Sequence, residues 1–300
     1  MVSRDAVVPV YFSPDYVLAR HEFDTTRKAL WVRESLVAAR IAGIELRTPA
    51  PLTGDDLAEV HDREYVDAVR TGVPRELAES QGFEWDSALW TMVCASNGGA
   101  VAAARAALRE GTAGSLSSGL HHARRGHGAG SCTFNGLALA ARAAVRAGAQ
   151  AILVLDLDAH CGGGTQALLG DDPQVWHTDV SVDDYDRHEA GPRATLDLVR
   201  RADDYLPTLQ RRLEALAHEA PRFDLCLYNA GMDLHERSGD GALAGISGAL
   251  LAERERLVFE WCRSRGTSVA FVLAGGYISS TLDRAELVDL HRLTLAAAAT

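Results

Sequence analysis

The sequence predicts a three-layer α/β fold, in which a central, mostly parallel sheet carries helices on both faces. Short apolar runs alternate with longer amphipathic segments along the chain, the order that builds a parallel sheet from strand–helix–strand units. The run at residues 151–155 is apolar throughout, which is typical of a strand buried on both faces. No internal repeat or linker-like tract interrupts this alternation, so we expect a single domain over residues 1–300.

Capping and turn residues divide the chain into elements. Asp24 and the two threonines after it supply helix N-caps, and Gly43 ends that helix. Gly98 and Gly99 lie inside a long alanine-rich segment and indicate a close-packing point or a kink. The predicted strands are 6–12, 44–47, 151–155, 175–180, 224–229 and 269–273, with a further run at 115–120. The predicted helices are 24–42, 55–60, 64–71, 86–109, 135–147, 201–219, 247–264 and 283–298.

Composition and charge exclude several classes of protein. A hydrophobic fraction of 47% and a charged fraction of 24% are ordinary for a globular enzyme. The formal net charge of -11 argues against direct nucleic-acid binding. Five widely spaced cysteines without a CxxC pair predict reduced thiols. The chain shows no apolar signal region and no stretch near the ~20 apolar residues of a membrane span, so we expect a cytoplasmic protein without a membrane partner.

Polar residues gather where the predicted strands end. Because the carboxyl ends of parallel strands meet at one edge of a sheet, where ligands bind in open α/β folds, we expect these residues to form one site. Burying so many polar groups without a function would be costly. The groups are His121 and His122, then Asp156, Asp158 and His160, then Asp233, and finally Gly275-Gly276-Tyr277.

Three of these residues form a candidate metal site. Asp158 and His160 are two positions apart after a buried strand, so both side chains can point to the same side. With Asp233 they offer one imidazole and two carboxylates, a three-ligand set that leaves positions open for water and a substrate carbonyl. Asp156 precedes Asp158 by one strand period and is expected behind the site, as a partner of an imidazole N–H or in a structural cation site.

Five ordered motifs resemble those of the histone deacetylase and acetylpolyamine amidohydrolase family, which has the arginase/deacetylase fold. The resemblance covers nearly the whole chain. The motifs are His121-His122-Ala123, Gly130-Ser131-Cys132 with Asn135, Asp156 to His160 followed by Gly164-Thr165, Ala230-Gly231-Met232-Asp233, and Gly275-Gly276-Tyr277.

This resemblance implies a zinc-dependent amide hydrolase, with Fe²⁺ or Co²⁺ as alternative metals for Asp158, His160 and Asp233. It implies that His122 is the general base beside His121, and that Tyr277 stabilises the oxyanion. The substrate would be an N-acylated amine, either a small molecule or acetyl-lysine, and a homo-oligomer is compatible with it. The resemblance further implies a substrate channel at Gly130, Ser131 and Gly276, a product exit at Arg27, and a structural K⁺ held by Asp156 and Asp179.

Three departures from the family pattern stand out. Where the family has a second His, a Gly and then Asp or Asn after the metal histidine, this chain has Cys161-Gly162-Gly163. His122 therefore loses its expected carboxylate or amide partner, unless another group or a water takes its place. Ser131 replaces a channel phenylalanine, and the acidic run 181–186 differs from the family's usual phenylalanine-containing run, which predicts a wider or more polar channel. The run 234–240 replaces the family's channel rim.

Two other functions compete with the deacylase. A two-manganese ureohydrolase of the arginase type would need further carboxylates near the metal histidine and after Asp233, where Gly162 and His235 stand. A catalytically weakened, acyl-binding member of the fold is the other alternative function. A further option concerns the mechanism, with Cys161 or Cys132 as a covalent nucleophile. The sequence leaves the substrate, the acyl length and the native metal open.

Overall fold

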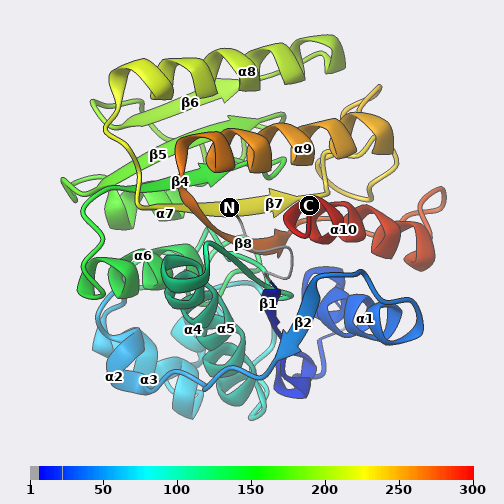
Figure 1. Cartoon of the computed structure of the whole chain (residues 1–300). Coiled ribbons are helices and arrows are strands. Elements are labelled where there is room, and N and C mark those ends of the chain that lie inside the picture. Colours follow the sequence, from blue (N-terminus) through cyan, green and yellow to red (C-terminus); the bar gives the residue numbers. More distant parts are fainter. Residues whose placement is uncertain (1–6, 22) are drawn as a thin grey trace.

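The computed structural model describes residues 7–21 and 23–300, and its centre is an eight-stranded sheet in which every pairing is parallel. The strand order is β2-β1-β3-β8-β7-β4-β5-β6, which runs from β6 at the top of Figure 1 down to β2. The strands are β1 (Val8–Tyr11), β2 (Ile44–Arg47), β3 (Thr112–Ser115), β4 (Ile152–Asp156), β5 (Val175–Ser181), β6 (Ala194–Leu198), β7 (Leu225–Gly231) and β8 (Ser268–Ala274).

Helices cover both faces of this sheet, as the sequence predicts. They are α1 (Asp24–Ala38), α2 (Gly54–Leu57), α3 (Arg63–Thr71), α4 (Arg75–Ala78), α5 (Leu89–Glu110), α6 (Gly136–Arg146), α7 (Gly163–Leu169), α8 (Ala202–Glu219), α9 (Gly248–Arg265) and α10 (Arg284–Ala298), with a short 3-10 turn at Pro14–Val17. No helix in the described part of the chain is both long and apolar enough to cross a membrane.

The central strand β4 contributes side chains to two hydrophobic cores, one on each face of the sheet. Leu153 and Leu155 pack on one face with residues of α1, α8, α9 and α10. Ile152 and Val154 pack on the other face with residues of α3, α5 and α6. All four side chains are fully buried, so this continuous apolar run is a strand covered on both sides, as expected from its composition.

The sheet also places the polar residues at a topological switch point. After β4 the chain builds outward through β5 and β6, then returns to form β7 on the opposite side of β4 and continues to β8. Ligand sites in open α/β sheets form at such a reversal, beyond the carboxyl ends of the two strands. Asp158 and His160 follow β4, and Asp233 follows β7, so the candidate ligands meet at this point.

Some elements differ from the sequence-based expectation. The edge strand β6 and the short helix α7 were not predicted, because β6 is only half buried and α7 begins within a glycine run that resembles a turn. The β3 strand ends at Ser115, so His121 and His122 lie on the loop after it and do not end a strand directly. The helix α5 is uninterrupted at Gly98, where a Cβ atom would lie 2.3 Å from the carbonyl oxygen of Ala50, so this glycine is a close-packing point.

Candidate metal centre and catalytic site

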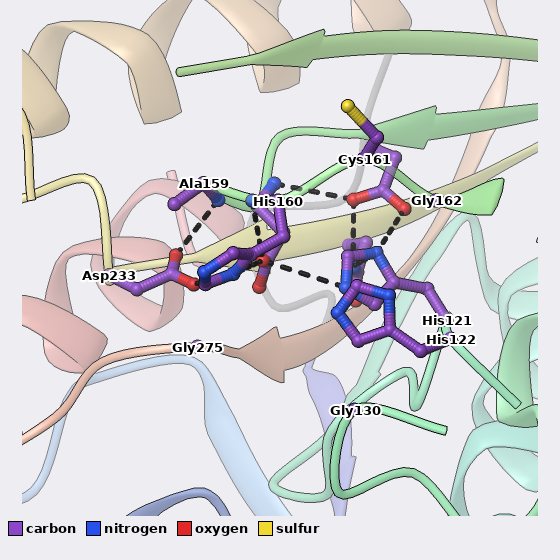
Figure 2. A network of polar contacts seen from close by, with 12 residues as sticks. His121, His122, Gly130, Ala159, His160, Cys161, Gly162, Asp233 and Gly275 are labelled. Atoms are coloured by element: carbon purple, nitrogen blue, oxygen red, sulfur yellow. Dashed lines mark hydrogen bonds and ion pairs between the residues drawn. The ribbon is translucent and has the colours of Figure 1, made fainter. Parts of the chain in front are cut away.

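The three predicted metal ligands converge. His160 Nδ1 lies 3.1 Å from Asp158 Oδ1 and 3.3 Å from Asp233 Oδ2. One potential ligand atom from each residue lies within 4.8 Å of the other two, and all three residues are buried. Figure 2 shows Asp233 beside the imidazole of His160. His121 and His122 lie on the other side of His160 in this view. The sequence therefore identified a real cluster.

The electrostatics of this cluster fit a bound divalent cation. Asp233 Oδ2 is buried and has no hydrogen-bond partner of acceptable geometry among residues 7–21 and 23–300, although the Ala159 N–H donates to its other oxygen at 3.0 Å. Burial, together with the nearby Asp158 carboxylate, raises the pKa of Asp233 to about 6. Two carboxylates that face one dry space repel each other, and a cation between them removes that cost. The donor set of one imidazole and two carboxylates suits Zn²⁺.

His121 is bound to the end of β4. Its Nδ1 lies 2.8 Å from Asp156 Oδ2, and Asn229 of β7 donates to the other oxygen of Asp156 at 2.8 Å. Burial opposes protonation of this imidazole, but Asp156 and Asp158 outweigh burial and raise the pKa of His121 to about 10. In the dyad formed by His121 and His122, His121 is therefore the charged member at neutral pH.

His122 has a carboxylate partner that the sequence did not predict. Its Nδ1 lies 2.9 Å from Asp186 Oδ2, in the loop after β5. The Gly164 N–H donates to the same oxygen at 3.0 Å, and Arg124 pairs with the other one. Burial, reinforced by the charge of His121, lowers the pKa of His122 to about 4. The second histidine is therefore neutral and held by one nitrogen, which leaves its Nε2 free to accept a proton.

Gly163 and Asp186 fit each other sterically. A Cβ atom at Gly163 would lie 2.2 Å from the Asp186 carbonyl oxygen and 2.6 Å from its Oδ1, so the aspartate occupies the room that a side chain at position 163 would need. Asp186 adopts φ 59, a left-handed conformation that is uncommon for residues other than glycine. Asp186 is therefore the group that takes the place of the partner missing at position 163, which the sequence left open. The acidic run 181–186 was visible in the sequence, but nothing in it indicated an inward-pointing carboxylate.

An aromatic side chain stands beside the dyad after all. The Tyr185 ring packs edge-on against His122, with ring centroids 4.9 Å apart. Gly130 lies against the same imidazole, since a Cβ atom there would be 2.5 Å from His122 Cδ2 and 3.1 Å from Tyr185 Cε1. The predicted channel residue Ser131 follows with φ 63, and its N–H donates to the Gln81 carbonyl at 3.0 Å. Tyr185 is 49% exposed, so an aromatic side chain reaches the surface beside His122, close to the predicted channel residue Gly130.

Tyr277 lies at the end of β8, close to the negative charge of the metal-ligand cluster. Burial, with Asp233 and Asp158 nearby, raises its pKa well above the ordinary value, so the phenol stays protonated. Its hydroxyl lies 3.4 Å from Thr25 Oγ1, and its ring lies 5.4 Å from that of Phe23. Gly276 packs against Leu287 and His291 of α10. The role of Gly276 in a substrate channel remains a prediction.

Two consecutive basic residues of α1 lie near this strand end, Arg27 half-buried and Lys28 fully buried. Arg27 donates to the carbonyl oxygens of Val17, Ala19 and His21, so its guanidinium holds the preceding loop, and a role in product exit remains a prediction. Lys28 is fully buried and donates to the Gly275 carbonyl. Burial lowers the pKa of Lys28 to about 8, against the opposing effect of Asp233. Nothing in the sequence distinguished Lys28 from a surface helix residue.

The two cysteines of the family-like motifs are poor nucleophiles. Cys132 and Cys161 are buried, and burial raises the pKa of each thiol to about 12. The reactive form of cysteine is the thiolate, which is scarce at neutral pH with such pKa values. Neither thiol is therefore suited to act as a covalent nucleophile.

Comparison with known proteins agrees with this geometry. The histone deacetylase domain matches residues 21–291. An uncharacterised protein of Picosynechococcus sp. is 33% identical over 296 residues, which cover 95% of this chain and 96% of that protein. Polyamine deacetylase HDAC10 of Rattus norvegicus is 29% identical over 89% of this chain, which spans about half of that longer protein (51%).

A solved structure supports the fold independently. The acetylpolyamine aminohydrolase from Burkholderia pseudomallei superimposes with a TM-score of 0.77 and 20% sequence identity, over 97% of this chain and 98% of that one. The match to the histone deacetylase domain and the deacetylase relatives indicate a hydrolase that acts on amide bonds. With the domain match covering most of its length, the chain belongs to the histone deacetylase family.

Proposed function

We propose that this protein is a zinc-dependent deacylase that removes an acetyl or other acyl group from an amine. The observation that carries the proposal is the buried cluster of Asp158, His160 and Asp233, which lies next to a neutral histidine. Zn²⁺ would be held by these three residues, and Fe²⁺ or Co²⁺ suit the same ligands. A zinc ion in such a site polarises the acyl carbonyl and lowers the pKa of a water ligand to about 7.

The two histidines divide the proton chemistry between them. His122 is neutral, and its Nδ1 is held by Asp186, so its Nε2 takes a proton from the attacking water and later gives it to the leaving amine. His121 stays charged through Asp156. Its charge stabilises negative charge that develops on the reacting acyl group, and it keeps the pKa of His122 low before the proton is taken.

Tyr277 would supply the oxyanion donor. Its phenol is protonated and lies at the end of β8, and a donor of this kind typically contributes about 3 kcal/mol to the transition state. The hydrogen bond from Thr25 Oγ1 is long at 3.4 Å, so the hydroxyl can leave it at little cost to reach the substrate. We propose this rotation as part of substrate binding.

The substrate is an N-acylated amine of a class that includes acetyl-lysine, acetylpolyamines and acylated metabolites. A polyamine deacetylase is among the sequence relatives and an acetylpolyamine aminohydrolase is among the structural neighbours, which makes an acetylpolyamine the first substrate to test. The face of Tyr185 beside His122 would pack against the aliphatic part of such an amine. Asp156 and Asp179 are in register on β4 and β5, and a K⁺ held by this pair remains a proposal.

The test is hydrolysis of N-acetylputrescine and of a fluorogenic acetyl-lysine peptide by metal-stripped protein, by the same protein with Zn²⁺ restored, and by Tyr277→Phe with Zn²⁺. We expect activity to return with the metal and to fall by about 10²–10³-fold in the variant, as for loss of one oxyanion donor. Restored protein that hydrolyses neither these substrates nor longer acyl amides would contradict the proposal. The ratio of the two rates ranks the amine classes.

A further inference from the structure

A second cluster of potential metal ligands lies on the neighbouring strand, outside the catalytic site. His177 and Asp179 alternate on β5, so both side chains point to the same face of the sheet. His188 reaches them from the loop that follows β5. One potential ligand atom from each of the three lies within 4.8 Å of the other two. The two imidazole rings stack at 5.0 Å with an interplanar angle of 22°.

Hydrogen bonds at the back of both rings orient their other nitrogens toward this space. His188 Nδ1 lies 3.2 Å from the carbonyl oxygen of Glu189, and His177 Nδ1 lies 3.2 Å from Gln166 Oε1. Because a carbonyl oxygen only accepts hydrogen bonds, each Nδ1 carries a proton, and Nε2 is the nitrogen of each ring that can bind a metal. Such a partner behind the ring is the usual support of a metal-binding histidine.

The forward nitrogen of His177 lacks a partner. His177 is 3% exposed, and its Nε2 has no hydrogen-bond partner in the described part of the chain. His188 Nε2 lies 3.3 Å from Asp179 Oδ2 and pairs with this carboxylate. A cation placed among the three atoms would satisfy the buried His177 nitrogen and take the place of the His188 proton that faces Asp179.

The backbone above the cluster carries no side chain at position 162. The Gly162 N–H donates to Asp179 Oδ2 at 2.7 Å. A Cβ atom at Gly162 would lie 3.2 Å from His177 Nε2 and 2.6 Å from Asp156 Oδ2. Any other residue at position 162 would therefore fill the space in front of the unpartnered nitrogen.

We propose that His177, Asp179 and His188 bind a second divalent transition-metal ion, with Zn²⁺ the best match to two imidazoles and one carboxylate. The nitrogen donors argue against an alkali or alkaline-earth ion, since K⁺, Ca²⁺ and Mg²⁺ prefer oxygen ligands. The ion is structural, because it lies behind Asp156 and not among the residues that face the acyl group.

This site would anchor the loop that completes the dyad. The loop between β5 and β6 carries Tyr185, Asp186 and His188 within four consecutive residues. Binding of His188 to an ion on β5 would fix the loop to the sheet two residues after the carboxylate that holds His122. The second ion is thus a positioning device for Asp186, although its presence does not depend on the proposed reaction.

Metal content separates this site from the catalytic one. Full-length protein is stripped, reloaded with Zn²⁺ in K⁺-free buffer, desalted and analysed by mass spectrometry of the elements. We expect two equivalents in the wild type, one in His188→Gln, one in His177→Phe, and one in Asp233→Asn, which loses the catalytic ligand instead. His218→Ala changes an exposed histidine of α8 and is expected to retain two.

Proteolysis gives a readout that does not depend on activity. Arg187 is exposed in the same loop, and trypsin can cleave after it when the loop opens. An ion at ten times its Kd slows such cleavage about tenfold when it binds only the closed loop. We expect Zn²⁺ to protect wild type and Asp233→Asn, and not to protect His188→Gln.

A single zinc equivalent in the wild type, or two in His188→Gln and in His177→Phe, would overturn the second site. Protection of the loop by K⁺ alone, with none from Zn²⁺, would equally overturn it in favour of an oxygen-ligand cation site. Two equivalents in Asp233→Asn with one in His188→Gln would instead support the second site and remove the proposed catalytic one, so the two proposals fail separately.

Discussion

The site has two halves that are built in different ways. The strand half consists of Asp156, Asp158 and Asp233, which follow or end β4 and β7 and are fixed by the register of these two buried strands. The loop half includes Asp186 and Tyr185, which are fixed by individual contacts between distant parts of the chain. The sheet positions the strand half, whereas the loop half depends on particular fits such as that of Gly163 against Asp186.

The largest expected effect comes from breaking the strand half. In Asp233→Asn, the amide keeps the shape of the side chain but removes a charged ligand from the cluster with Asp158 and His160. We expect activity to fall by more than about 10³-fold, because a site that loses its metal loses both carbonyl polarisation and water activation. Initial rates with saturating Zn²⁺ measure this, alongside the zinc content of the variant.

The fold itself is expected to survive this substitution, since removal of one of two mutually repelling buried carboxylates relieves strain. Unchanged circular dichroism and thermal unfolding of the metal-free protein would check that. An Asp233→Asn variant with near wild-type rates would show that the cluster is not the catalytic metal site.

The next effect tests the loop half. In Asp186→Asn, the side chain keeps its size but loses its charge. Because His122 Nδ1 and the Gly164 N–H share one oxygen of Asp186 while Arg124 pairs with the other, the NH₂ group of the amide must face either Arg124 or the Gly164 N–H. The imidazolium that forms when His122 accepts a proton also loses its carboxylate partner, so we expect kcat to fall by about 10²-fold, within the range of general-base catalysis. The zinc content should not change.

A matched control is available in the same loop. Asp184 is exposed and pairs with Arg200 on the surface, so Asp184→Asn removes the same charge from the loop without touching His122. We expect rates within about twofold of wild type, as is usual for exposed ion pairs. Equal losses in the two variants would mean that the net charge of the loop matters, and that the orientation of His122 by Asp186 does not.

The difference between the halves also explains what the sequence revealed. Asp158, His160 and Asp233 were predictable because residues that follow buried parallel strands must meet at one sheet edge. Asp186 was not, because its position depends on a left-handed turn and on an empty place at Gly163, a pairing between segments that no local pattern encodes. Asn229 behind His121, and Lys28 beneath Gly275, were missed for the same reason.

We expect a smaller loss of activity from a substitution that displaces the loop half but leaves the charge of Asp186 in place. Gly163→Ala introduces a Cβ atom 2.2 Å from the Asp186 carbonyl oxygen, so the loop must shift while its carboxylate remains. We expect kcat to fall about tenfold, since small displacements of positioning groups reduce rates at this scale. Measurement of kcat, together with a crystal structure of the variant, would test this prediction. A loop that has not shifted and a wild-type rate would contradict the steric interpretation.

The smallest expected effect concerns stability. His61 joins two parts of the loop half: its Nδ1 lies 2.8 Å from the Arg124 carbonyl, and the Asn135 N–H donates to its Nε2 at 3.0 Å. Burial lowers the pKa of His61 to about 4, so the folded protein holds this imidazole neutral. The unfolded chain has the ordinary value near 6.5 and binds the proton first as the pH falls. Stability from this group is therefore present above pH 6.5 and is lost between about pH 6.5 and 4.

His61→Gln separates this loss from that of the other buried histidines. Between pH 7 and 5, the wild-type free energy of unfolding should fall by about 2 kcal/mol more than that of the variant, the value that linkage gives for one such histidine. Urea denaturation at the two pH values measures the difference, and the shared contributions of His177 and His291 cancel between the two proteins. The strand half carries no such dependence on His61, so zinc content at pH 7 should be equal in both. If the free energy of unfolding fell equally with pH in wild type and in His61→Gln, the neutral imidazole of His61 would not be what stabilises the loop half.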